Sequence, residues 1–289
     1  MGGFTTADSN LYIDMGVRLW RGFPFLGFDL YQATPGAFFP SLPYIPPLWP
    51  IIAGATFLMG GLVFVSFINM LFVVFSAQVF FLLAKRFMDI RIAFISVLTA
   101  YLTMPLLVIA LYPWTEGLAL FLMSVFLFVL FFYPDKNSLL GILTGMMFLT
   151  RPQYVLPMLV LSVLFFKKDR RRFWFAFILI ALLYEAVCLV FFHQLYPKLY
   201  IHPTQFISKT GHNAPDALAF LRAYGERLSR LFIDPVRMLF FFSVFIALKR
   251  FWEKEDARKL IVSSLIILMT YPALFAFMYV KEFFGVLAN

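Results

Sequence analysis

Charged residues are scarce in this chain of 289 residues. Only 13% of the residues are Asp, Glu, Lys or Arg, whereas 62% are hydrophobic and 40 are Phe. A soluble protein of this length has too little interior to hide so much apolar surface. The composition therefore excludes a soluble globular domain and predicts an integral membrane protein.

Cysteine and histidine are also rare, with the single Cys188 and three histidines. One cysteine cannot form an intramolecular disulfide, and no spacing of His, Cys and carboxylates fits a zinc site. No glycine-rich phosphate loop follows a strand pattern. We therefore predict no metal site and no firm cofactor, although a divalent cation between Asp8, Glu116 and a phosphate is compatible with the sequence.

The formal net charge is +9, but the lysines and arginines are spread along the chain between apolar runs. This distribution is typical of a membrane protein whose basic loops set its orientation, and it does not favour nucleic-acid binding. We therefore expect membrane lipids as partners and no nucleic acid.

Long apolar runs, rather than an alternation of apolar and polar residues, predict helices that cross a hydrocarbon core of about 30 Å. The fold class is accordingly all-α, a polytopic integral membrane domain over 1–289 with about seven to nine transmembrane or half-membrane helices and large external loops. The runs cover residues 51–60, 62–84, 92–112, 117–133, 138–166, 173–193, 236–248 and 260–280.

Three connections are basic: the one around Lys85, KKDRRR at 167–172, and the segment 249–259. The positive-inside rule assigns such loops to the cytoplasm. The remaining connections then face the opposite side of the plasma membrane or the endoplasmic reticulum membrane. The predicted segments are an external loop with an interfacial helix at 1–50, a helical core at 51–193, an external loop at 194–235 and C-terminal helices at 236–289.

The run 138–166 is long for one membrane crossing and short for two. Its middle carries TRPQ, in which Pro152 lacks an N–H and breaks a helix. We predict two half-helices that enter from the cytoplasmic side and turn there, bringing Arg151 to membrane depth; a long kinked helix is the alternative. Intramembrane charges tend to be paired, so Arg151 is expected to pair with Glu185.

The front of the chain combines an amphipathic stretch with a stiff one. IDMGVRLWRGF at 13–23 suits a short helix lying along the membrane interface. Seven prolines between Pro24 and Pro50 then hold the chain extended until YIPPLWP reaches the membrane surface. Such a segment is expected to frame a site.

Several motifs taken together resemble the GT-C superfamily of membrane glycosyltransferases. They are, in order, Asp8 followed by Tyr12, Gly22, PPLWP at 46–50, Gly60 with Gly61, WTEGLAL at 114–120 and GILTGMMFLTRPQ at 141–153. The resemblance covers roughly residues 8–170 and is nearest to the enzymes related to dolichyl-phosphate-mannose protein mannosyltransferases and lipid A aminoarabinose transferases. The family places a transmembrane helix before the loop Asp and more helices at its end, so the resemblance also implies a shortened chain.

The resemblance implies transfer of a sugar from a polyprenyl-phosphate donor, dolichyl or undecaprenyl, to a protein, lipid or glycan acceptor. The transfer would take place on the non-cytoplasmic face, usually with inversion. Two alternatives stay open, a polytopic transporter and a noncatalytic membrane assembly protein. Charges concentrated outside rather than at the midplane disfavour the transporter.

Two acids are the candidate catalytic residues. A carboxylate within reach of the acceptor hydroxyl can take its proton as the anomeric carbon is attacked, and Asp8 is the candidate base. The alternative is that Asp8 only caps a helix that begins at Ser9. Glu116 would orient the acceptor or the sugar hydroxyls, or would only interact with the dipole of its own helix.

The candidate substrate-binding residues are mostly basic. Arginine suits bidentate contact with a phosphate, although an interfacial helix with arginines that meet lipid headgroups is an equally good reading of the segment 216–232. The candidates are Tyr12, Arg151, Arg222, Arg230, Lys209 and His202.

Overall fold

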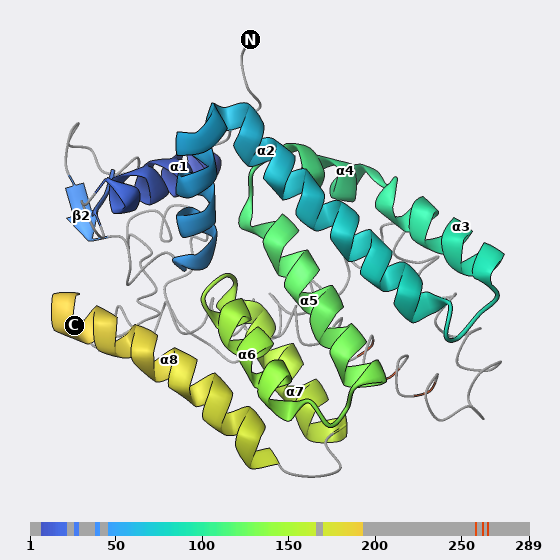
Figure 1. The fold of residues 1–289 in the computed structure, drawn as a ribbon. Coiled ribbons are helices and arrows are strands. Elements are labelled where there is room, and N and C mark those ends of the chain that lie inside the picture. Colours follow the sequence, from blue (N-terminus) through green and yellow to red (C-terminus); the bar gives the residue numbers. More distant parts are fainter. Residues whose placement is uncertain are drawn as a thin grey trace, which may run out of the picture. The chain divides into compact units, whose positions relative to one another are not determined.

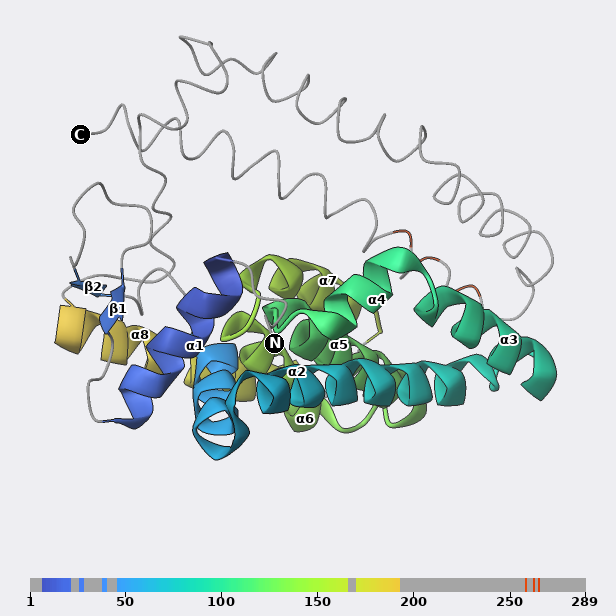
Figure 2. The ribbon, with the colours of Figure 1, turned by 90° about the horizontal axis from the view of Figure 1, so that it is seen from above.

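The computed structural model describes residues 7–21, 26–28, 38–40, 46–165 and 170–192, together with Arg258, Val262 and Leu265. The chain divides into two compact units, Met1–Lys198 and Leu199–Asn289. The first unit contains every helix and strand with described bounds (Figures 1 and 2). The predicted external loop 194–235 and the apolar run 236–248 lie outside the described residues.

The helical class predicted from the sequence is confirmed, with eight α-helices in the described part of the chain. The described part of the chain also contains one pair of antiparallel three-residue strands. Gly27 lies opposite Phe39 in this pair. The elements are α1 (Ala7–Trp20), β1 (Leu26–Phe28), β2 (Phe38–Pro40), α2 (Leu48–Ala84), α3 (Ile90–Tyr101), α4 (Met104–Leu111), α5 (Thr115–Phe132), α6 (Asn137–Phe148), the 3₁₀ turn η1 (Pro152–Tyr154), α7 (Val155–Phe165) and α8 (Arg170–Phe192).

Three of the described helices are long and apolar enough to cross a membrane, which indicates a multi-pass membrane protein. They are α2, α5 and α8, the last over Arg170–Val190. The apolar stretch of α5 is 67% buried, whereas those of α2 and α8 are each 17% buried. Helix α5 is therefore the centre of the bundle, and α2 and α8 turn apolar surface outward, as lipid-facing helices do.

Three of the predicted apolar runs do not each form one straight helix. The runs 51–60 and 62–84 join in α2, with a kink where Gly60 and Gly61 leave helical geometry and Gly61 takes a φ of +67°. The run 92–112, predicted as one segment, is instead broken between α3 and α4. Thr103 is extended there, and Pro105 occupies the first turn of α4, where a missing N–H costs little.

The predicted helical hairpin is present, and the alternative of one long kinked helix is wrong. Helices α6 and α7 pack against each other, and Figure 1 shows the turn between them at one end of the pair. The N–H groups of Thr150 and Arg151 both bond to the carbonyl of Met147, which closes α6 before η1 begins. At about 1.5 Å per residue, the 12 and 11 residues of α6 and α7 give half-membrane lengths. The depth of the turn in a membrane stays a prediction.

The short helix predicted for 13–23 is present as α1, but it begins earlier, at Ala7, and ends at Trp20. Its position along a membrane interface stays a prediction. The helix lies across the first turns of α2 (Figure 2). The two backbones touch at Gly16 and Gly54, where an added Cβ on either glycine would overlap the other helix. The indole N–H of Trp20 donates to the carbonyl of Ile51 at 2.8 Å and fastens the end of α1.

A second close helix contact, between α6 and α8, uses a pair of glycines four residues apart. A Cβ on Gly141 would overlap the carbonyl of Phe173, and one on Gly145 would press against Ile180. Small residues at this spacing let membrane helices approach closely enough for extensive van der Waals contact. The contact holds the hairpin against α8.

Replacing Gly141 by Val is expected to lower the free energy of unfolding by about 1–3 kcal/mol, because the added atoms force α6 away from α8. The matched control is Ile142→Val, at the neighbouring exposed position of the same helix, with an expected change within about 0.5 kcal/mol. Thermal unfolding in detergent, followed by tryptophan fluorescence, measures both. Equal losses in the two variants would show that the helices do not pack at Gly141.

Candidate functional site

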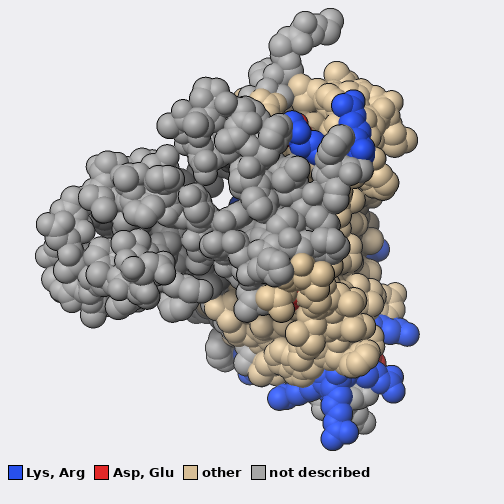
Figure 3. Space-filling view, turned by 90° about the vertical axis from the view of Figure 1, so that its left-hand side faces the viewer, with Lys and Arg blue, Asp and Glu red and all other residues tan. Residues whose placement is uncertain are grey.

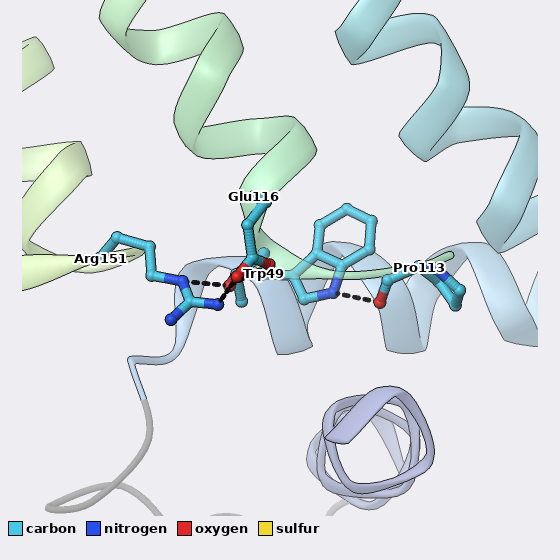
Figure 4. Close-up of polar contacts among 5 residues, drawn as sticks. Trp49, Pro113, Glu116 and Arg151 are labelled. Carbon is cyan, nitrogen blue, oxygen red and sulfur yellow. Dashed lines mark hydrogen bonds and ion pairs between the residues drawn. The ribbon is translucent and has the colours of Figure 1, made fainter. Parts of the chain in front are cut away.

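Three segments that are far apart in the sequence meet at one end of the helices. They are the first turn of α2, the first turn of α5 and the α6–α7 turn. The N–H of Leu48 donates to the carbonyl of Leu149 at 2.9 Å. The buried indole N–H of Trp49 donates to the carbonyl of Pro113 at 3.1 Å (Figure 4). The start of α2 thereby ties the other two segments together.

An ion pair between Arg151 and Glu116 lies where these segments meet (Figure 4). The Arg151 side chain reaches from the hairpin turn to the first turn of α5, where its Nη2 binds Oε1 of Glu116. Its Nε donates to the hydroxyl of Thr115, which in turn lies 3.3 Å from Oε2 of Glu116. Thr115 is buried, and the side chains of Arg151 and Glu116 keep 26% and 30% of their surface exposed.

The remaining amino group of Arg151, Nη1, makes no hydrogen bond to any residue in the described ranges, whereas Nε and Nη2 are engaged. Within the described part of the chain, its donors are therefore open to a further acceptor. Two tyrosines, Tyr12 from α1 and Tyr154 from η1, lie near the guanidinium. The site thus offers a fixed cation, a carboxylate and nearby phenols in one place.

Helix α1 packs against α8 and the end of α6 next to this site. Leu11 and Met15 of α1 form a buried cluster with Tyr184 and Cys188 of α8, and Tyr12 packs against it. Phe148 and Leu149, at the end of α6, pack against the same cluster. The apolar face of α1 therefore rests on the hairpin and on α8, which explains why Tyr12 lies near Arg151.

The expected partner of Arg151 is corrected by the structure, since its carboxylate is Glu116 and not Glu185. On α8, the buried residues Tyr184 and Cys188 face the hairpin and α1. Glu185 is a neighbour of Tyr184 and lies one turn before Cys188 on α8, whereas the Arg151 side chain reaches the first turn of α5. Glu116 is closer because α5 begins beside the hairpin turn.

The other candidate site residues are placed only in part. The backbone of Asp8 lies in the first turn of α1, so it does not precede a helix that begins at Ser9. The Asp8 side chain lies outside the described residues, and its backbone is one turn before that of Tyr12 on α1. Four candidates also lie outside the described residues: Arg222, Arg230, Lys209 and His202. No group of three His, Cys, Asp or Glu residues suited to a metal ion occurs within the described ranges.

Asn69, which was not among the predicted site residues, positions the turn before Glu116. Its fully buried side chain lies in the middle of α2. The Nδ2 group donates to the carbonyls of Ile109 and Tyr112, each at 2.6 Å, at the end of α4. A Cβ on Gly117 would overlap the Oδ1 of Asn69. An amide inside a long apolar run is the sequence signal for such a role, because a buried polar group in a membrane helix needs a partner.

Comparison of the chain with protein-family models, with curated proteins and with solved structures gives no match. The class that the described residues define is a multi-pass membrane protein with a half-helix hairpin and an Arg–Glu pair at its turn.

Replacing Asn69 by Leu is expected to lower the free energy of unfolding by about 1–3 kcal/mol, because buried carbonyls of the α4–α5 turn lose their donor. The matched control is Gln78→Leu, a change from amide to leucine at an exposed position of the same helix. Thermal unfolding in detergent measures the difference. If both variants unfold at the same temperature, Asn69 does not support the turn.

Proposed function

We propose that the protein is a glycosyltransferase that moves a sugar from a polyprenyl-phosphate donor to a protein, lipid or glycan acceptor. The transfer takes place on the non-cytoplasmic face of the plasma membrane or the endoplasmic reticulum, with inversion. One observation supports this most directly. The segments that resemble the GT-C membrane glycosyltransferases are α1, the start of α2, the start of α5 and the hairpin turn, and they meet around the Arg151–Glu116 pair.

The reaction needs a cation for the leaving phosphate, and Arg151 fits this need. The acceptor oxygen attacks the anomeric carbon while the bond from that carbon to the phosphate oxygen breaks, and the phosphate leaves with the electron pair. A fixed guanidinium stabilises the charge that develops on that oxygen. Nε and Nη2 hold the Arg151 side chain in place, and Nη1 is the group that contacts the phosphate.

The acceptor proton needs a carboxylate, and two are proposed to share the work. Asp8 takes the proton as the new glycosidic bond forms. Glu116 accepts a hydrogen bond from an acceptor or sugar hydroxyl through the part of its carboxylate that remains exposed. Tyr12 lies one turn after Asp8 on α1 and near Arg151, so it contacts the donor between the two charged groups.

The location of the site suits a substrate with a lipid tail. The hairpin helices are half-membrane in length, and α8 beside them exposes large apolar side chains such as Leu182 and Leu183. A polyprenyl chain can therefore lie in the bilayer along these helices while its phosphate reaches Arg151. The described basic residues at the end of α2 and at the start of α8 lie at the opposite end of the helices from the site, which supports a non-cytoplasmic position for the site.

The test is release of free polyprenyl phosphate by the purified full chain from a panel of polyprenyl-phosphate sugars, with and without added acceptors. Arg151→Gln, Glu116→Gln and Asp8→Asn are each expected to lower the rate by about 100-fold or more. The matched controls are Arg18→Gln and Asp14→Asn, which break a solvent-accessible pair on α1. Their rates are expected to stay within about threefold of the unchanged protein.

Two results would contradict the proposal. Release that survives all three site substitutions would place the chemistry elsewhere. The second result is that the folded protein binds none of the radiolabelled donors in a direct binding assay. This result would favour the transporter or the assembly protein instead.

A further inference from the structure

The end of the bundle away from the Arg151–Glu116 pair carries a cluster of basic side chains, here called the basic end. They come from the α2–α3 connection and the start of α3, from the α5–α6 connection and from the first turn of α8, and all are exposed. Figure 3 shows lysines and arginines gathered at this end of the molecule. The members are Lys85, Arg86, Arg91, Lys136, Arg170, Arg171 and Arg172.

Acidic residues are too few to neutralise the basic end. Only Asp89 and Asp135 lie in the described parts of the same connections. Asp89 also accepts a hydrogen bond from the N–H of Arg91 at 2.8 Å, because it caps α3. Among the described residues, seven cations against two carboxylates leave an excess of five positive charges. An excess of this size favours an anionic partner.

One of these arginines is fixed in place across two connections. Arg86, at the end of α2, donates from Nη1 to the carbonyl of Phe131 at 2.7 Å. Its guanidinium carbon also lies 5.0 Å from the ring centre of Phe132. Both partners belong to the last turn of α5. The contact therefore links the α2–α3 and α5–α6 connections and keeps their cations close together.

Exposed apolar and aromatic side chains border the basic end. Ile90 and Ile92 flank Arg91 on α3, and Phe175 follows Arg172 on α8. Tyr133, at the end of α5, is also exposed. Membrane proteins place aromatic residues at headgroup level, with cations just outside the hydrocarbon. A soluble polyanion would leave these apolar side chains in water, whereas a bilayer buries them.

We propose that the basic end binds the phosphate groups of anionic phospholipids in the leaflet that it faces. The cations of these segments contact several headgroups at once, while the bordering apolar side chains enter the acyl region. This inference does not rest on the proposed transferase activity, since it concerns the opposite end of the helices.

The test measures the lipid that the full chain retains. The protein is extracted from vesicles containing equal amounts of phosphatidylglycerol and phosphatidylcholine, delipidated stepwise in detergent, and its bound lipid is quantified by mass spectrometry. The unchanged protein is expected to retain phosphatidylglycerol in several-fold excess. The double variant Arg171→Gln/Arg172→Gln is expected to lose most of this excess, since each arginine near a headgroup layer contributes on the order of fivefold.

The matched control is the double variant Arg18→Gln/Arg21→Gln, which removes two arginines from α1 at the other end. It should keep the preference for phosphatidylglycerol. Comparable thermal midpoints for the two double variants show that folding is not the cause. Equal retention of the two lipids by the unchanged protein would overturn the proposal, as would equal losses in both double variants. Full displacement of the lipid by millimolar inorganic phosphate would also overturn it, since it would identify free phosphate as the ligand.

Discussion

The ion pair between Arg151 and Glu116 is the interaction on which the described structure most depends. Charged groups are costly to remove from water, and a partly buried pair is retained only where good geometry and further hydrogen bonds compensate that cost. Thr115 supplies the additional hydrogen bond to Arg151. Because the pair joins the hairpin turn to the first turn of α5, it fixes the half-helices against the most buried helix.

Helix α2 bonds to the segments on either side of this ion pair. Its first turn bonds to the hairpin through Leu48 and to the turn before α5 through Trp49. Two turns beyond the kink at Gly60–Gly61, Asn69 holds the same turn from another side. One long helix therefore positions both members of the ion pair. The kink changes the direction of α2 between its two sets of contacts.

The two ends of the helices differ in the way they use charge. At the site end, two ion pairs are supported by hydrogen bonds, Arg151 with Glu116 and Arg18 with Asp14. At the basic end, cations exceed carboxylates and are exposed. Paired charges suit a specific binding site, whereas an unbalanced and exposed group suits a headgroup layer. This asymmetry agrees with the orientation expected from the positive-inside rule.

Local properties of the chain made the helical class and the hairpin predictable from the sequence. Long apolar runs form helices in a membrane, and Pro152 interrupts one run. The break between α3 and α4, the partner of Arg151 and the role of Asn69 were decided by tertiary structure. Each depends on which residues from distant segments become neighbours. The pattern along one segment carries no information about which carboxylate another segment will bring within reach of Arg151.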